Sequence, residues 1–300
     1  RISCAKIRLT LKPESTYPSM SSSIYQLQNA SRLLTFNAPR IMGVLNCTPD
    51  SFFSGSRSKT TKTAIEKGQS MLAAGADILD VGGQSSRPGA IEVGAAEEWQ
   101  RIEGTIKGLL DSNPETLVSV DTFHHEVALN ALNAGAFMIN DIYGGSRDAN
   151  MVKVITEFNA PYAIMHMQGT PSTMQAQPFY EHITSEVLLW LDDRMNHLRQ
   201  QGVKQFMADV GFGFGKTVGH NFELLRGLDQ FQKLNVPILV GVSRKSMIYK
   251  TLNGQPETAL NGTTALHAWA LERGAHMLRV HDVAEAVSYT HLTLPTIHRV

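Results

Sequence analysis

The chain has 300 residues, of which 42% are hydrophobic, and its 27 basic and 27 acidic side chains balance. This balance gives no electrostatic indication of a nucleic-acid or membrane-surface partner, and no apolar stretch approaches the roughly 18 residues of a membrane-spanning helix. The two cysteines, Cys4 and Cys47, cannot build a disulfide framework. We therefore expect a reduced, cytoplasmic protein.

Short apolar runs recur along the chain at intervals of roughly 30 residues, and each run ends in polar residues. The runs cover residues 40–45, 77–81, 117–120, 137–139, 162–165, 205–208, 236–242 and 276–278. Helical periodicity predicts helices near residues 61–75, 96–111, 124–135, 149–159, 180–201, 219–233 and 257–273, and an eighth helix that begins at residue 282. This alternation predicts a single α/β domain over residues 38–287, a (β/α)8 TIM barrel with its active site at the C-terminal ends of the strands.

Both ends of the chain lack this pattern. Residues 1–37 show no strong periodicity and no signal-peptide core, so we interpret them as a poorly ordered N-terminal extension. A natural start at Met20 is favoured over a longer disordered extension. Residues 288–300 are rich in β-branched residues and contain Pro295, which makes a poor helix interior. We interpret this tail as an atypical, non-native segment that truncates or replaces the eighth helix.

Four polar side chains stand at the ends of different predicted strands: Asp121, Asn140, Asp209 and Lys245. Closure of the barrel would bring them together in one mouth. Carboxylates accept paired hydrogen bonds, an amide both donates and accepts, and a lysine donates. Any one of these groups could simply cap a strand end. Together they favour a binding site for a flat heterocycle with an amino-pyrimidinone edge.

A second set of strand-end residues suits an anion. Ser86 and Arg87 follow the second strand, Arg279 and His281 follow the eighth, and Asn46 follows the first. These strands are neighbours in a closed barrel, and arginine offers a fork of donors to phosphate oxygens. The neutral amide of Asn46 can ligate Mg2+, which also binds waters and substrate phosphates. Taken alone, Arg279 or His281 would be interpreted as an ion-pairing strand end.

The glycine-rich segment at residues 211–217 is similar to a phosphate-binding P-loop, but it has three residues, not four, between its first glycine and its Gly-Lys pair. Close approach of the backbone to a ligand explains these glycines better. Residues 46–52 and 85–90 have the composition of loops that close over a site, although ordinary connectors could share that composition.

Eight motifs along residues 40–287 occur in the order and at the spacing of one known family. They are Asn-Cys-Thr-Pro-Asp-Ser-Phe at 46–52, Gly-Gly-Gln-Ser-Ser-Arg-Pro-Gly at 82–89, Ser-Val-Asp-Thr at 119–122, Ile-Asn-Asp at 139–141, Met-His-Met-Gln-Gly at 165–169, the glycine-rich segment at 211–216, Ser-Arg-Lys-Ser at 243–246 and Arg-Val-His-Asp at 279–282. In this ordered set the chain resembles the dihydropteroate synthases. The resemblance implies a barrel enzyme of folate synthesis. Such an enzyme joins 6-hydroxymethyl-7,8-dihydropterin diphosphate to 4-aminobenzoate and releases 7,8-dihydropteroate and diphosphate.

The resemblance also implies which residues of this chain bind each part of the substrates. The pterin ring would contact Asp121, Asn140, Met165, Asp209 and Lys245. The diphosphate would contact Asn46, Ser86, Arg87, Arg279 and His281, with the cofactor Mg2+ on Asn46. The 4-aminobenzoate pocket would consist of Phe52, Pro88, Phe214 and Ser246. Catalysis would depend on Arg87, Asp121, Lys245, Arg279 and His281.

The implied chemistry is ionisation of the pterin C–O bond followed by capture of the cation, because the aniline amine is already neutral and nucleophilic at neutral pH. The resemblance further implies sensitivity to sulfonamides, which mimic 4-aminobenzoate, and a homodimer if the C-terminal helix is intact. Two alternatives remain open at this point. One is a methyltetrahydrofolate-dependent methyltransferase barrel, which has no use for a diphosphate pocket, and the other is a non-catalytic pterin-binding protein.

Overall fold

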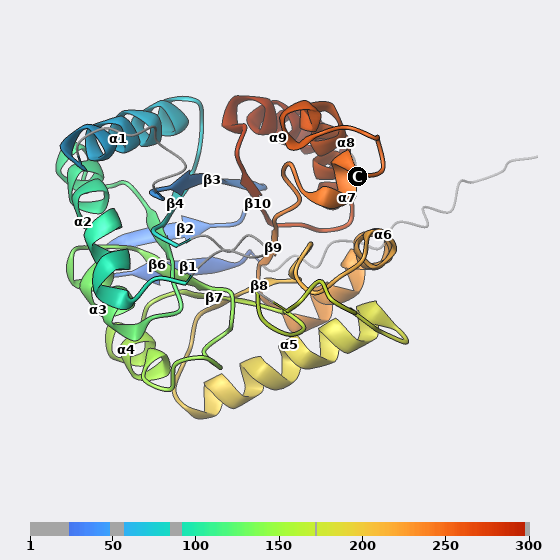
Figure 1. The fold of residues 1–300 in the computed structure, drawn as a ribbon, viewed down its shortest axis with the longest axis horizontal. Helices are drawn as coiled ribbons and strands as arrows, with labels where there is room; N and C mark the ends of the chain where they lie inside the picture. The colour runs from blue at the N-terminus through green and yellow to red at the C-terminus, as the bar shows by residue number, and fades with distance from the viewer. Residues whose placement is uncertain (1–23, 49–56, 85–91, 172, 298–300) are drawn as a thin grey trace, which may run out of the picture.

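The computed structural model describes residues 24–48, 57–84, 92–171 and 173–297. Its main sheet consists of β3 (Arg40–Asn46), β4 (Ile78–Gly82), β5 (Val118–Asp121), β6 (Met138–Asp141), β7 (Tyr162–Met165), β8 (Phe206–Asp209), β9 (Ile238–Val240) and β10 (Met277–Val280). These eight parallel strands close into a barrel in the order β10-β3-β4-β5-β6-β7-β8-β9 (Figure 1). Each predicted apolar run forms one of the strands, which confirms the predicted (β/α)8 barrel.

Helices follow the strands along the chain and surround the barrel (Figure 1). They are α1 (Arg57–Ala73), α2 (Ala95–Ser112), α3 (His125–Asn133), α4 (Met151–Phe158), α5 (Ile183–Gln200), α6 (Val218–Arg226), α7 (Ser246–Tyr249), α8 (Leu260–Glu272) and α9 (Val283–Ile297), with the 3-10 helices η2 (Leu228–Leu234) and η3 (Pro256–Thr258). Every residue of β4 is buried, because the barrel interior covers one face and the helices cover the other. The predicted helix at residues 219–233 is divided into α6 and η2.

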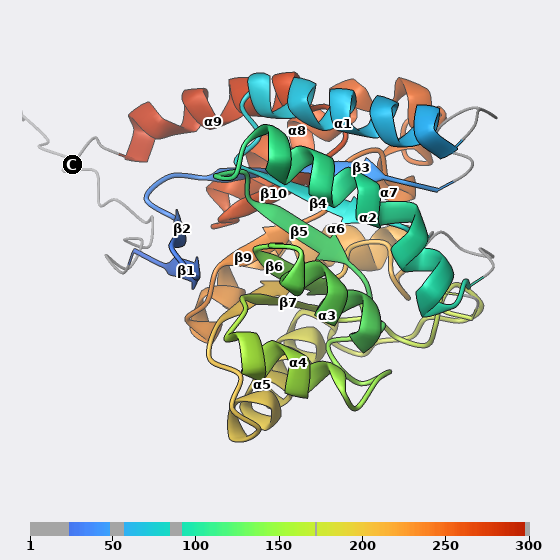
Figure 2. The same ribbon diagram turned by 90° about the vertical axis from the view of Figure 1, so that its left-hand side faces the viewer.

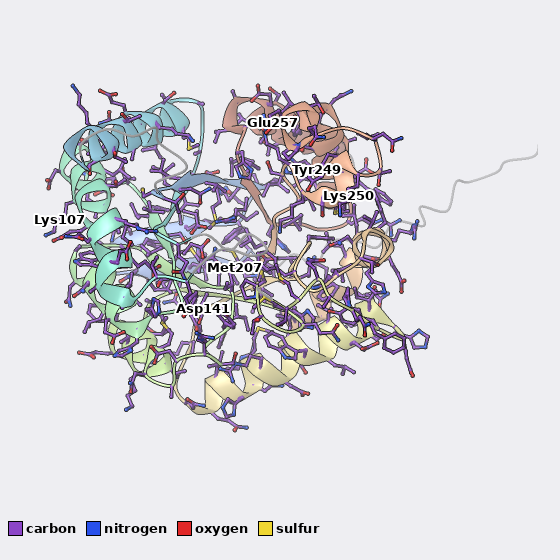
Figure 3. The ribbon with its side chains drawn as sticks, in the orientation of Figure 1. Lys107, Asp141, Met207, Tyr249, Lys250 and Glu257 are labelled. Carbon is purple, nitrogen blue, oxygen red and sulfur yellow. The ribbon has the colours of Figure 1, made fainter. Side chains whose placement is uncertain are left out.

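Alternate strand residues face the barrel interior, since strand side chains point to opposite faces in turn. Near the N-terminal ends of the strands an apolar floor fills this interior, and Figure 3 labels Met207, one of its members. The floor includes Met42, Ile78, Met138, Ala163, Met207, Leu239 and Met277. Two residues further along five of these strands stand Asp80, Asn140, Met165, Asp209 and Arg279. The strand period therefore places these side chains on the inner face, between the floor and the C-terminal mouth.

A β-hairpin closes the opposite end of the barrel. Strands β1 (Gln26–Asn29) and β2 (Arg32–Thr35) pair antiparallel, and Figure 2 shows them beyond the N-terminal ends of the barrel strands. Leu27, Leu34 and Phe36 are buried against the apolar floor. Such a short hairpin is marginal alone, so its packing on the barrel is what stabilises it.

The expectation that residues 1–37 are a poorly ordered extension is therefore wrong for residues 24–37. The strands are too short for a periodic pattern to stand out in the sequence. The rest of the predicted extension, including Met20, lies outside the described residues.

Truncation of Leu34 to alanine is expected to lower the free energy of unfolding by about 2–5 kcal/mol, because the side chain packs into the closed end of the barrel. Leu34 is 4% exposed, whereas its neighbour Leu33 is 49% exposed. Leu33→Ala is the matched control and should change the same free energy by less than about 0.5 kcal/mol. Urea unfolding followed by circular dichroism measures both, and equal losses would contradict this packing.

The C-terminal helix α9 continues to Ile297, through most of the tail that the sequence suggested as a poor helix. It packs along α8, β3 and β10, and Val283 and Ala286 are buried. A Cβ on Gly75, just beyond α1, would come within 3.0 Å of Val287, so this contact is close. At the start of the tail, Tyr289 packs against the core and Thr290 is 6% exposed, so tertiary packing outweighs the low helix propensity there.

The prediction that the eighth helix of the barrel is truncated or replaced is therefore wrong in its first alternative, because α9 runs to Ile297. The origin of the tail sequence stays a hypothesis, and residues 298–300 lie outside the described part. Within the described residues, no helix combines the length and the apolar character that crossing a bilayer requires.

Candidate active site

Arg279, on β10, is the centre of a charged cluster in the barrel mouth. Its Nε donates to Oδ2 of Asp80 at 2.7 Å, and its Nη2 donates to Oδ2 of Asp121 at 2.9 Å. The two carboxylates belong to β4 and β5, so one guanidinium connects three strands of the barrel. Burial alone would lower the pKa of Arg279, but Asp80 and Asp121 raise the pKa above its ordinary value. The guanidinium therefore stays charged.

Asp121 ends β5 and is the more accessible of the two carboxylates, with 17% of its side chain exposed. Burial raises the pKa of Asp121, Arg279 opposes this effect, and the neighbouring Asp80 carboxylate adds to it. The net effect raises the pKa of Asp121 to about 7, so this accessible carboxylate changes its charge in the neutral pH range.

Asn140 joins the same cluster from β6. Its Nδ2 donates to Oδ2 of Asp80 at 3.0 Å, the oxygen that also accepts from Arg279. Because the amide nitrogen is used there, the amide oxygen is the atom with which Asn140 can accept a hydrogen bond from a ligand. The amide oxygen of Asn140 can therefore accept a hydrogen bond from an N–H group of a heterocycle.

Sequence reasoning missed Asp80, which lies inside the apolar run of β4 and not after its end. The side chain is 0% exposed. The available signal was an ionisable residue inside an apolar strand, because aspartate is almost never fully buried unless it is paired.

Asp209 and Lys245 form the second charged part of the mouth. Asp209 ends β8, and its Oδ1 accepts from the backbone N–H of Gly211 at 2.8 Å. Burial raises the pKa of Asp209, while Lys245 lowers it. Nζ of Lys245 donates to the carbonyl of Phe212 and lies 4.6 Å from the centre of the Phe214 ring. Burial lowers the pKa of Lys245 to about 8, although Asp209 opposes this change.

A buried lysine, Lys216, organises the glycine-rich loop that carries these phenylalanines. Its Nζ donates to the carbonyls of Gly211 at 2.9 Å and Phe214 at 3.0 Å, and to Nδ1 of His166 at 3.0 Å. Burial lowers the pKa of Lys216 to about 7 and that of His166 to about 3, so the imidazole is a neutral acceptor. Gly211 has φ of +72°, and a Cβ there would lie 1.9 Å from the carbonyl oxygen of His166. The loop is therefore folded around its own lysine, unlike a P-loop.

Met165 provides an apolar surface beside the charged groups. It is 3% exposed and clusters with Phe123 and Ile142, against which Tyr143, Met167 and Phe214 pack. Aromatic and thioether groups favour contact with the face of a ring. The mouth therefore combines polar groups for the edge of a heterocycle with apolar groups for its face.

The remaining predicted residues stand at the border of this cluster or outside the described chain. His281 follows β10, and its Nδ1 lies 3.0 Å from Oγ of Ser243. Asn46 ends β3, and Ser246 begins α7. Phe52, Ser86, Arg87 and Pro88 lie outside the described residues. The structure thus brings together Asp121, Asn140, Asp209, Lys245 and Arg279, and places Met165 with Phe214.

Asn46 has the chemistry of a magnesium ligand. An amide oxygen is a hard donor, and Mg2+ usually takes one or two protein ligands together with waters and substrate phosphates. Another group, His125, Glu126 and Asp148, holds its ligand atoms within 4.8 Å of one another. There Asp148 accepts from the backbone N–H of His125 at 3.0 Å and from its Nδ1 at 2.7 Å. The Asp148 carboxylate thereby satisfies the first N–H group of α3, so these contacts account for its position without an ion.

Comparison with known proteins agrees with this geometry. The model of the pterin binding enzyme family matches residues 42–281. The dihydropteroate synthase of Escherichia coli is 41% identical over 256 residues, which cover 85% of this chain and 90% of that protein.

Solved structures are similar as well. Dihydropteroate synthase of Xanthomonas albilineans with 4-aminobenzoic acid has a TM-score of 0.86 at 36% identity, covering 93% of this chain and 100% of that one. The same organism's enzyme in complex with 7,8-dihydropteroate has a TM-score of 0.83 at 34% identity, covering 92% and 100%. A sulfonamide drug complex of the Yersinia pestis enzyme has a TM-score of 0.85 at 35% identity, covering 91% and 99%.

The chain forms a (β/α)8 barrel whose mouth contains carboxylates, an amide and a lysine, and the family model matches almost the whole barrel. The chain therefore belongs to the family of pterin-binding enzymes. Within the family it is a dihydropteroate synthase, an enzyme of folate biosynthesis. The resemblance seen in the sequence motifs is confirmed, while the roles of the individual residues stay predictions.

Proposed function

We propose that the barrel mouth joins 6-hydroxymethyl-7,8-dihydropterin diphosphate to 4-aminobenzoate by ionisation of the pterin C–O bond followed by capture of the cation. The observation that carries this proposal is the convergence of Asp121, Asn140 and Arg279 on one hydrogen-bonded cluster. Asp209 and Lys245 lie close enough to influence each other's pKa in the same mouth.

The pterin ring has an edge with neighbouring N–H donors and a carbonyl. In the proposed complex the amide oxygen of Asn140 and the carboxylate of Asp209 accept from these donors, and Lys245 donates to a ring oxygen or nitrogen. Met165 lies in the apolar cluster and would contact the ring face.

The diphosphate is proposed to contact Asn46, Ser86, Arg87, Arg279 and His281. With Mg2+ held by the Asn46 amide, the bound ion would neutralise charge on the leaving diphosphate. The Arg279 guanidinium is permanently cationic and adds to this field at the end of β10. The 4-aminobenzoate pocket is proposed to consist of Phe52, Pro88, Phe214 and Ser246. The Xanthomonas enzyme is solved with 4-aminobenzoic acid and the Yersinia enzyme with a sulfonamide drug, which supports binding of both kinds of molecule by this chain.

In the reaction, the C–O bond between the pterin methylene and the diphosphate breaks, and both bonding electrons leave with the diphosphate. The resulting methylene cation is conjugated with the pterin, and Asp121 offsets its charge. The amine nitrogen of 4-aminobenzoate then forms the new C–N bond and loses one proton to solvent. Positioning and electrostatics account for catalysis, so no strong general base is required.

The pH dependence of kcat/KM for the pterin substrate is expected to be bell-shaped. Asp121 acts when ionised, and because its pKa is raised, the acid limb should lie above the ordinary carboxylate range. Lys245 acts when protonated, and because its pKa is lowered to about 8, the rate should fall as the pH rises through that value. In Lys245→Arg the guanidinium stays charged, so the alkaline limb should move to higher pH. Steady-state kinetics across pH measure this, and an unmoved alkaline limb would exclude Lys245 as its source.

Turnover by the full chain tests the proposed function. Purified protein is incubated with the pterin diphosphate, 4-aminobenzoate and Mg2+, and dihydropteroate is measured by liquid chromatography and mass spectrometry. We expect dihydropteroate and diphosphate in equal amounts, slower turnover when Mg2+ is chelated, and competition between a sulfonamide and 4-aminobenzoate. Folded protein that binds the pterin diphosphate without forming product would instead support the non-catalytic pterin-binding alternative.

We also propose that the enzyme is a cytoplasmic homodimer that associates through its C-terminal helices. The continuous α9 and its packing on α8 support this arrangement, and the free, buried Cys47 fits a reducing compartment. Light scattering coupled to size-exclusion chromatography measures the mass in solution, and a monomer at all concentrations would contradict the dimer.

A further inference from the structure

We propose that Asp80 is a positioning residue for pterin binding, which sets the orientation of Asn140 and Arg279 without contacting the substrate itself. Oδ2 of Asp80 accepts from Asn140 Nδ2 at 3.0 Å and from Arg279 Nε at 2.7 Å. A single oxygen thus fixes two groups that the proposed function places at the substrate, and the inference rests on that function.

The asparagine is the more informative of the two partners. A primary amide can turn over and exchange its donor and acceptor ends at nearly constant shape. The carboxylate of Asp80 accepts only, so it selects the orientation in which the nitrogen of Asn140 faces β4 and the oxygen remains for a substrate N–H. Without an acceptor at position 80, both orientations of the Asn140 amide become accessible. In one of them the amide NH2 group faces the substrate N–H, so two donors meet and no hydrogen bond forms.

Arg279 is oriented by the same atom. Its fork spans Asp80 on β4 and Asp121 on β5, and the two contacts hold the guanidinium plane. Of these carboxylates, Asp80 is 0% exposed. Its Oδ1 is also buried and has no hydrogen-bonding partner among the described residues. An unpaired buried oxygen is unfavourable for stability, so the presence of a carboxylate at this position fits a role in orientation better than a role in packing.

The test compares two variants of Asp80 with a matched control. Asp80→Ala removes the acceptor and is expected to weaken binding of the pterin diphosphate on the order of 10- to 100-fold, as loss of an outer-shell partner commonly does. Asp80→Asn keeps an acceptor oxygen and should lose clearly less. Asp77→Asn is the control, because Asp77 pairs with Arg40 at 2.9 Å next to the other end of the same strand. Isothermal titration calorimetry with the pterin diphosphate gives the affinity, which Asp77→Asn should leave unchanged.

A rescue separates orientation from general damage. In the double variant Asp80→Ala, Asn140→Asp, residue 140 presents an oxygen in either orientation and restores one carboxylate near Arg279. Its affinity for the pterin diphosphate should therefore recover relative to Asp80→Ala. The proposal is overturned by unchanged pterin affinity in Asp80→Ala, by equal losses in the alanine and asparagine variants, or by a double variant that does not recover.

If Asp80→Ala does not fold, the asparagine variant decides: a loss beyond about 10-fold would contradict orientation by the acceptor oxygen. Wild-type turnover is measured in the same preparation. A wild type that binds the pterin diphosphate but forms no product would overturn the proposed function. The affinities of the Asp80 variants for the pterin diphosphate would still test the positioning role of Asp80, because they depend on binding alone.

Discussion

Replacement of Arg279 by methionine is expected to lower the free energy of unfolding by about 3–5 kcal/mol and to abolish turnover. The guanidinium is the partner of Asp80 at 2.7 Å and of Asp121 at 2.9 Å. Methionine would leave two neighbouring carboxylates without their shared cation, one of them 0% exposed. Denaturant unfolding and steady-state kinetics of the same purified variant measure the two effects.

Two companion variants separate charge from geometry. Arg279→Lys keeps the positive charge but not the planar fork, so it should retain part of the stability and lose most of the rate. Arg40→Met removes the ion pair with Asp77 at the other end of the barrel, where both side chains are about one quarter exposed (25% and 24%), and should cost less. If Arg279→Met unfolds no more easily than Arg40→Met, the charged cluster does not have the central position assigned to it.

Asp121→Asn is expected to reduce kcat on the order of 10²- to 10³-fold and to change the KM for the pterin substrate much less. The substitution preserves shape but removes the negative charge that would face the methylene cation. That cation exists only near the transition state, so its loss of stabilisation should appear in kcat. Steady-state kinetics measure both constants.

Asp192→Asn, an isosteric change at an exposed position of α5, is the matched control and should leave both constants unchanged. A kcat for Asp121→Asn close to that of the wild type would mean that the carboxylate has no part in charge stabilisation. A rise in KM alone would instead limit its role to binding.

The barrel and most of the charged cluster could be predicted from the sequence, because both follow from the spacing of the apolar runs and the shared direction of the parallel strands. Parallel strands have their C-terminal ends at the same rim, so polar residues that end separate apolar runs meet there. Asp121, Asn140 and Asp209 converge for this reason. Lys245 lies just beyond β9, and its contact with the glycine-rich loop adds it to the same mouth.

Asp80 and Lys216 could not be found in this way. Asp80 stands two residues before the end of β4, so its position inside an apolar run concealed it. The spacing at residues 211–217 argues against a phosphate-binding loop, but no role for Lys216 follows from the sequence; its Nζ donates to two carbonyls of its own loop. The partners of Asp80 are distant in sequence, and Lys216 likewise contacts the distant His166 in addition to its own loop.

The secondary structure of the two chain ends could not be predicted from the sequence for a similar reason. The β1–β2 hairpin and residues 288–290 of α9 have weak local signals, and packing against the rest of the protein stabilises their structure. A prediction from local propensity therefore described both ends as irregular. The barrel strands were predicted more reliably, because burial on both faces produces continuous apolar runs.

The most direct test of the central claim is a crystal structure of the enzyme with 6-hydroxymethyl-7,8-dihydropterin diphosphate bound. We expect the edge of the pterin ring to hydrogen-bond with Asn140, Asp209 and Lys245, with Asp121 beside the ring and the diphosphate directed toward Asn46 and His281. A pterin bound outside the mouth, or inside it without contact to these three residues, would contradict the account.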